Sequence, residues 1–145
     1  MKLTLFSDYS LRILIYAALR QEERFSVVEV AQAYQLSRNH AAKAVNFLTQ
    51  RGYLRAQRGP GGGLCLAQAA TAIRVGAVVR LTETGAPLVE CFTPASNTCP
   101  LIHVCLLQRA LAEAWTAFFH TLDQYTLADL VRQPNPLRQA LQLPL

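Results

Sequence analysis

Three cysteines lie close together in the second half of this 145-residue chain. Seven residues separate Cys91 from Cys99, and five separate Cys99 from Cys105. Thiolates are soft ligands that suit iron–sulfur clusters, zinc or copper(I). The spacing lacks the Cys-x-x-Cys pairs of common structural zinc sites. The segment therefore predicts a metal centre, and in the usual four-ligand case a fourth ligand must come from elsewhere.

Two residues are candidates for this fourth ligand. His103 is the nearest in the sequence, and together with the three cysteines it would make a structural zinc site. Asp8 lies at the start of a predicted helix, from which it could reach the cysteine loop of a second subunit. Its alternative role is to stabilise the positive end of that helix dipole. The fourth cysteine, Cys65, lies on a predicted strand, where we expect it to pack inward as a small apolar side chain.

The elements that position these residues follow from the spacing of the apolar and turn-forming side chains. A capping box, Ser26-Val27-Val28-Glu29, predicts where the second helix begins. The predicted elements of the first half are a helix from an N-cap at Ser7 to about Gln21, a helix from Ser26 to about Tyr34, a helix from Ser37 to about Gly52, a strand at 53–58, a turn at 59–63 and a strand at 64–66. Three helices followed by a basic hairpin indicate a winged helix-turn-helix.

The third predicted helix has one apolar side and one polar side. Ala41, Ala44 and Val45 lie at helical spacing on the apolar side. On the polar side, Asn39 can pair with adenine through two hydrogen bonds, and Lys43 can reach a guanine edge or a phosphate. The side chains that we expect to contact DNA from this helix are Ser37, Arg38, Asn39, His40, Lys43 and Gln50. Their ordinary alternative is a solvated helix face.

The predicted hairpin supplies further cations. Arg55 and Arg58 flank a turn in which Gly61 and Gly62 let the backbone approach a duplex closely. We therefore expect this wing to add affinity and shape readout. The Gly-Pro-Gly-Gly-Gly run lacks the Lys-Ser/Thr of a phosphate-binding P-loop and leads into a strand, which argues against a nucleotide site.

The second half is predicted to sense and to dimerise. A short helix at 73–82 ends at a break around Gly85, Ala86 and Pro87, and a long helix at 104–125 carries an apolar band too broad for one neighbour to cover. We expect the proline-containing tail, 134–145, to be irregular. The fold class is thus mainly α with a small β-hairpin, divided into a DNA-binding head (1–67), a connecting helix and cysteine loop (68–103), a dimerisation helix (104–126) and a C-terminal tail (127–145).

Composition and charge agree with this division. Residues 1–66 carry nine Lys and Arg against four Asp and Glu, whereas residues 67–145 carry five of each, so the net charge of +5 belongs to the head. A basic head suits a phosphate backbone. Apolar residues make up 52% of the chain and charged residues 16%, compared with roughly 25% charged in average proteins, which predicts a buried subunit interface. No apolar run approaches the roughly 20 residues of a membrane span, so we expect a cytoplasmic protein with reduced thiols.

Three motifs together resemble the Rrf2 family of transcription factors. They are Leu3-Thr4-x-Phe6-Ser7-Asp8-Tyr9-Ser10-Leu11-Arg12, Gly59-x-Gly61-Gly62-Gly63-Leu64-x-Leu66-Ala67, and Glu90-Cys91-Phe92 with Asn97-Thr98-Cys99-Pro100-Leu101 and Cys105. The likeness covers nearly the whole chain, and within the family the chain most resembles the nitric-oxide-sensing repressors.

The resemblance implies a homodimeric winged-helix repressor with one iron–sulfur cluster per subunit, bound by Cys91, Cys99 and Cys105. It also implies that Asp8, donated across the dimer, completes a [4Fe–4S] site, which we favour over a [2Fe–2S] site. A related regulator of the family uses a histidine three residues after its last cysteine as the fourth ligand. This chain has Gln108 at that position, which argues against the same ligand here. Nitrosylation of the cluster by nitric oxide is expected to release operator DNA.

Other functions stay open at this point. The chain could instead sense iron, cluster supply or redox state, or carry a structural zinc at the cysteines and His103. An iron–sulfur electron carrier would have no use for the basic head. A thiol enzyme using Cys105 with His103 or His120 would need an orienting carboxylate and a nucleophile motif, and neither is visible in the sequence. We therefore expect a regulator and not an enzyme.

Overall fold

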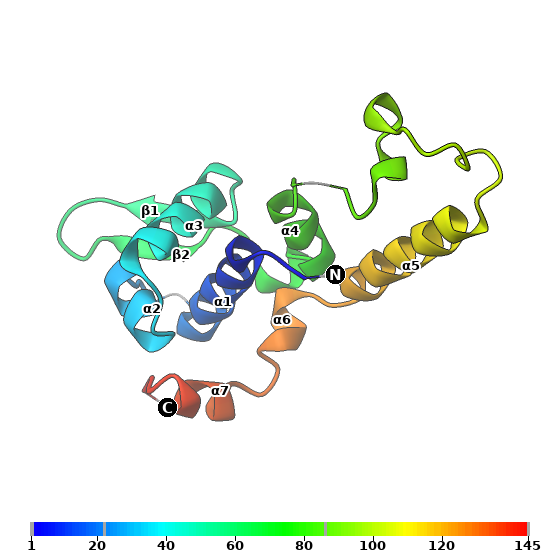
Figure 1. Cartoon of the computed structure of the whole chain (residues 1–145). Helices are drawn as coiled ribbons and strands as arrows, with labels where there is room; N and C mark the ends of the chain where they lie inside the picture. The colour runs from blue at the N-terminus through cyan, green and yellow to red at the C-terminus, as the bar shows by residue number, and fades with distance from the viewer. Residues whose placement is uncertain (1, 22, 86, 145) are drawn as a thin grey trace.

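The computed structural model describes residues 2–21, 23–85 and 87–144. The chain is mainly helical with one antiparallel hairpin, as the sequence predicted. Its main elements are α1 (Leu5–Arg20), α2 (Val27–Ala33), α3 (Arg38–Gln50), β1 (Leu54–Gln57), β2 (Gly63–Leu66), α4 (Val75–Thr82), α5 (Leu106–Asp123), α6 (Leu127–Leu130) and α7 (Pro134–Ala140), with short 3-10 turns η1 (Ala70–Ala72), η2 (Glu90–Phe92) and η3 (Pro94–Ser96). Figure 1 shows a compact head from which α5 projects, with the cysteine segment at its far end.

Helix α1 is the central element of the head. It packs against α3, α4, α6 and α7, and Ile13, Leu14 and Ala17 on it are fully buried. The predicted N-cap was wrong: the helix begins one turn earlier, and the Thr4 side chain accepts the hydrogen bond from the Ser7 backbone N–H. Ser7 is buried instead, and its hydroxyl lies 2.7 Å from the Thr82 hydroxyl.

The rest of the head agrees with the sequence prediction. Ser26 and Glu29 form the predicted capping box at the start of α2, and α3 begins directly after Ser37. The hairpin pairs Leu54 with Leu66 and Arg55 with Cys65. Phe25 adds a bridge to Leu64 on β2 and is 1% exposed, so the segment before α2 anchors the wing to the core.

The connection between the head and α5 has little regular structure beyond α4. The predicted helix at 73–82 is present from Val75, and the long helix is present as α5. Ala86, in the predicted break between them, lies outside the described residues. The cysteine segment holds only η2 and η3, which agrees with the expectation that its prolines hinder regular structure.

The tail is helical, so the prediction of an irregular 134–145 segment was wrong. Thr126 and Asp129 form a capping box that opens α6, and α7 starts at Pro134. Proline is tolerated in the first turn of a helix, where its missing N–H has no partner to lose. Leu141 and Leu143 then pack against the core of the head, and Arg138 donates to the Leu19 carbonyl at the end of α1.

Candidate functional site

The predicted recognition side of α3 is exposed. Ala41, Ala44, Val45 and Leu48 are buried against the head, which turns the opposite side outward. All six residues predicted to contact DNA from this helix are on the exposed surface: Ser37, Arg38, Asn39, His40, Lys43 and Gln50. Ser37 makes no side-chain cap hydrogen bond, and the first turn of α3 has no acidic residue, so nothing on the helix competes with an anion at this positive end.

Helix α1 supports α3 through aromatic contacts that the sequence reasoning missed. The rings of Phe6 and Phe47 meet edge to face at 5.2 Å, and Tyr9 lies 6.0 Å from His40. Tyr9, His40 and Lys43 border a small cavity of about 80 Å³ between the two helices. The first two turns of α1 therefore help to set where α3 lies.

The wing carries its two predicted arginines on the surface. Arg55 and Arg58 are exposed, and the Arg55 Nε donates to the Cys65 sulfur at 3.1 Å. Cys65 is buried at 4% exposure, as predicted, and it pairs with Arg55 across the hairpin. Gly61 has φ +71°, and a Cβ on Gly62 would lie 2.4 Å from the Gln57 carbonyl oxygen. The turn therefore requires glycine at both positions.

The three clustered cysteines occupy one segment between α4 and α5. Cys91 lies in η2, Cys99 follows η3, and Cys105 is the N-cap of α5, where its sulfur accepts the Gln108 backbone N–H at 3.4 Å. All three are half-buried free thiols. Their chemistry fits an iron–sulfur group. Within residues 2–21, 23–85 and 87–144, however, no three His, Cys, Asp or Glu side chains converge on one metal position.

Glu90 organises the cysteine segment, a role that the sequence reasoning did not assign. Its carboxylate accepts hydrogen bonds from the backbone N–H of Thr98 at 2.5 Å and from the Thr98 hydroxyl at 2.8 Å. The backbone hydrogen bond from Thr98 is the main cause that lowers the pKa of the Glu90 carboxyl. The Asn97 side chain accepts the Cys99 backbone N–H at 3.1 Å. These contacts fold the segment so that Cys91 and Cys99 belong to one closed loop.

Asp8, the predicted fourth ligand, is paired within its own chain. Its carboxylate meets Arg12 one turn later, with contacts at 2.8 and 2.9 Å, and it lies away from the cysteines of this chain. His103, the alternative ligand, is exposed on the loop. Neither residue joins the three thiols among the described residues, so the fourth ligand stays a prediction.

A different anchor connects the start of α1 to the end of α4. The Glu83 carboxylate accepts hydrogen bonds from the Thr4 backbone N–H at 2.7 Å, from the Thr4 hydroxyl at 2.9 Å and from the Ser7 hydroxyl. Partial burial raises the pKa of Glu83, but these hydrogen bonds outweigh it, so the pKa lies below the ordinary 4.5. Sequence reasoning had no signal for Glu83, because the pairing spans 79 positions.

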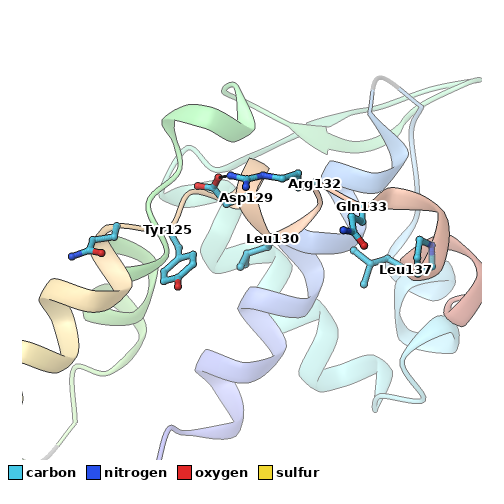
Figure 2. Close-up of a pocket in the computed structure, with 8 residues that line it drawn as sticks. Tyr125, Asp129, Leu130, Arg132, Gln133 and Leu137 are labelled. Atoms are coloured by element: carbon cyan, nitrogen blue, oxygen red, sulfur yellow. Dashed lines mark hydrogen bonds and ion pairs between the residues drawn. The ribbon is translucent and has the colours of Figure 1, made fainter.

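A surface cavity lies away from both the recognition surface and the cysteine segment. It has a volume of about 630 Å³ and lies where α6 and α7 meet the end of α5 (Figure 2). Tyr125 and Leu130 border it, and Asp129 and Arg132 form an ion pair at its edge, with a contact of 2.6 Å. The Asp129 carboxyl also accepts from Thr126, which helps to lower its pKa to about 2. Asp129 and Arg132 therefore neutralise each other's charge at the edge of this cavity.

The exposed α3, the glycine turn with its arginines and the compact three-helix support define a winged helix-turn-helix protein. No helix within the described part of the chain is long and apolar enough to span a membrane. The Rrf2 family, described as iron-dependent transcriptional regulators, matches residues 3–133. The chain belongs to the Rrf2 family, and so to a family of regulators and not of enzymes.

Individual relatives agree with this assignment. The chain is 44% identical over 144 residues to the HTH-type transcriptional regulator NsrR of Halalkalibacterium halodurans, with 99% of both chains covered. It is 42% identical over 144 residues to NsrR of Bacillus subtilis, again with 99% of both chains covered. Among solved structures, the oxidised form of Staphylococcus aureus CymR is similar at 26% identity and a TM-score of 0.71, covering 90% of this chain and 95% of CymR. The sequence-based resemblance, to the Rrf2 family and within it to NsrR, is confirmed.

Proposed function

We propose that this protein is a homodimeric iron–sulfur repressor that binds operator DNA and releases it when nitric oxide reacts with the cluster. In this proposal residues 1–67 bind DNA, 68–103 contain the cluster-binding loop, 104–126 supply the last cysteine ligand and dimerise, and 127–145 form the C-terminal tail. Its place is the cytoplasm, where DNA is accessible and thiols stay reduced. The observation that carries the proposal is the position of three free thiols on one loop between the DNA-binding head and α5.

The DNA-binding part of the proposal rests on the exposed side of α3 and on the wing. Asn39 and Lys43 supply the groups that read base edges, while Ser37, Arg38, Gln50, Arg55 and Arg58 suit the phosphate backbone. The charge distribution supports this, since the head alone accounts for the net charge of +5. His40, held beside Tyr9, lies at the edge of the same surface.

The dimer is supported by exposed apolar side chains at the start of α5 and just before it. Val104 is 82% exposed, Leu106 is 73% exposed and Leu107 is 66% exposed. Side chains of this size cluster at one surface mainly where a partner covers them. A second copy of the chain is the proposed partner, because two winged heads related by a two-fold axis match the symmetry of a palindromic operator.

The cofactor assignment rests on donor chemistry and on the family. Cys91, Cys99 and Cys105 are the proposed ligands, with Asp8 of the other subunit as the fourth, and this set favours a [4Fe–4S] over a [2Fe–2S] cluster. When bound, such a cluster supplies iron atoms that react with nitric oxide. The chain's own contribution is mechanical: Cys105 is the N-cap of α5, so a change in what its sulfur binds alters the first turn of the dimerisation helix.

An oxygen-free titration tests this proposal. Purified protein is bound to an operator fragment selected from random DNA, and nitric oxide is added while visible absorption and DNA retention are followed together. We expect the absorption to change and the DNA to dissociate over the same range of nitric oxide. Undiminished DNA binding after the cluster is destroyed contradicts the proposal.

A second candidate function is iron sensing, which the family's description as iron-dependent favours. The same titration distinguishes the two. An iron sensor should lose DNA when a chelator removes iron, and should respond to nitric oxide only after iron has been lost. A nitric oxide sensor should respond before any iron leaves the protein.

A further inference from the structure

Helix α5 is attached to the head at its C-terminal end. Beyond that end, the Val75 backbone N–H donates to the Tyr125 carbonyl at 3.0 Å, and Leu127 donates to the Ile73 carbonyl at 2.8 Å. The Arg74 side chain adds a hydrogen bond to the Asp123 carbonyl at 3.2 Å. Two backbone hydrogen bonds and one side-chain hydrogen bond thus join the start of α4 to the end of α5.

Side chains reinforce this attachment along α4. Arg80 binds Asp123 through two parallel hydrogen bonds, at 2.7 and 2.5 Å. The Arg80 guanidinium also lies 4.5 Å from the centre of the Phe119 ring, and Phe119 is buried with Val75 and Val79. A planar guanidinium that is held by a carboxylate on its edge and by an aromatic ring on its face has one preferred orientation.

Gly76 fixes how closely the two helices approach. It is buried in α4, and a Cβ placed on it would lie 2.1 Å from an Asp123 carboxylate oxygen and 3.1 Å from the Asp123 backbone nitrogen. A Cβ at this position would displace the Asp123 carboxylate from its place beside Arg80 and crowd the backbone at the end of α5. We call Gly76, Arg80, Phe119 and Asp123 together the α4–α5 joint.

Among the described residues, the opposite end of α5 makes no comparable attachment to the head. Its first turn carries Cys105 and the exposed Leu106 and Leu107, and Figure 1 shows this end projecting away from the head. The helix has 18 residues, so it is about 27 Å long at about 1.5 Å per residue. A rotation of about 10° at the joint moves the far end by roughly 5 Å, which exceeds the base-pair step of about 3.4 Å.

We propose that the α4–α5 joint sets the distance between the two recognition helices of the dimer and thereby determines which half-site spacing the protein accepts. The proposal rests on the homodimer proposed above. In that dimer the partner binds α5, α4 packs on α1, and α1 packs on α3. The angle between α4 and α5 is therefore the link through which the dimer interface positions α3. Arg80 and Asp123 are positioning residues: they act on DNA choice without touching DNA.

The test compares Arg80→Ala with a matched control, Arg132→Ala. The control removes an arginine that also binds an aspartate, but its partner Asp129 lies only three residues earlier, in α6 (Figure 2). The control pair therefore does not join two packed helices. Palindromic operators are selected from random DNA by the wild-type dimer, and then one base pair is added or removed between the half-sites. Affinity for each is measured on oxygen-free protein, with dimer content followed by sedimentation and cluster content by absorption.

We expect the wild type and Arg132→Ala to prefer the selected spacing at least tenfold. Arg80→Ala should narrow that preference to about threefold or less, while dimer and cluster content stay unchanged. Arg80→Lys keeps the charge and loses the two-pronged contact, so it should give an intermediate preference. If Arg80→Ala does not fold, Arg80→Lys serves as the test of the inference.

The outcomes separate this inference from the proposed function. A wild-type protein that is monomeric, or that selects no DNA, overturns the homodimeric repressor and this inference with it. A wild-type dimer that binds DNA with no spacing preference overturns the inference alone. The inference is also overturned when folded dimers of Arg80→Ala or Arg80→Lys keep the full wild-type preference.

Discussion

The head and the segment from the cysteine loop into α5 differ in how much of their apolar surface a single chain buries. In the head, α1 packs against α3, α4, α6 and α7, and Ile13, Leu14 and Leu19 on it are buried, whereas Leu5 at its start is 59% exposed. In the segment from the cysteine loop to the middle of α5, the apolar residues Leu101, Val104, Leu106 and Leu107 are exposed, and three half-buried thiols have no common partner among the described residues. One copy of the chain therefore buries most of the apolar side chains of the head, whereas the other segment leaves apolar side chains exposed and its thiols free.

This difference assigns separate tasks to the two regions. The head holds a DNA-reading surface in a fixed shape, which suits a surface that must match the major groove. The cysteine loop has free thiols, and the start of α5 has exposed leucines. Such groups suit a region whose contacts change with the signal. The α4–α5 joint connects the two regions, and in our proposal it sets how α5 positions α3.

Phe25→Ala should have the largest effect on the head. Phe25 is 1% exposed, contacts the Tyr16 ring at 5.2 Å and bridges to the wing through Leu64. Removing a buried phenylalanine costs about 3–5 kcal/mol, so the free energy of unfolding measured by urea should fall by that amount. The loss should not depend on whether a cluster is bound. A loss below about 1 kcal/mol would mean that the head is not packed as described.

Leu107→Glu should affect the other region and leave the head intact. A carboxylate placed in an apolar interface is costly to desolvate, so the dimer should dissociate at least tenfold more readily in sedimentation measurements. Gln139→Glu, at an exposed position on α7, is the control and should leave the dimer unchanged. A Leu107→Glu dimer as stable as the wild type would place the interface elsewhere.

Asn39→Ala tests the reading surface without disturbing the core. A lost two-hydrogen-bond contact to a base costs about 1–3 kcal/mol, so operator affinity should fall roughly tenfold to a hundredfold, with less discrimination at one base position. Asn135→Ala, on the exposed side of α7, should change neither. Equal affinities for the selected operator would remove Asn39 from the interface.

Glu83→Gln should have the smallest effect, at the boundary between the two regions. Because the pKa of Glu83 lies below 4.5 in the folded protein, its contribution is present above about pH 4.5 and is lost as the pH falls through the lowered pKa. At pH 7 the variant should lose about 1 kcal/mol, a typical cap contribution. Near pH 3 the difference from wild type should narrow. Glu113→Gln, on exposed α5, should lose nothing at either pH.

The head was predictable because its signals are local. The capping box at Ser26, the apolar side of α3 and the glycine turn each lie within a few residues, and the structure confirms all three. The start of α1 was misplaced because Thr4 and Ser7 are both good caps, and a contact with Thr82, 75 positions away, decides between them. The tail was misjudged because its prolines were taken as breakers, although Pro134 lies at a helix start.

The candidate site was predictable in residue types and less so in arrangement. Exposure of Asn39, Lys43 and Arg58, and burial of Cys65, follow from periodicity and are confirmed. Glu83 and the α4–α5 joint were missed, because their partners are between 43 and 79 positions apart and no spacing rule connects them. The fourth ligand stays a prediction for the same reason: Asp8 would have to come from another subunit.

The iron and sulfide content of oxygen-free protein tests the central claim most directly, with Cys99→Ala compared with Cys65→Ala. We expect the wild type and Cys65→Ala to contain iron and acid-labile sulfide and to share a visible absorption band. Cys99→Ala should lose iron, sulfide and the band while its helical content by circular dichroism stays unchanged. Wild-type protein without iron or sulfide even after reconstitution, or a Cys99→Ala variant with full colour, would contradict the account.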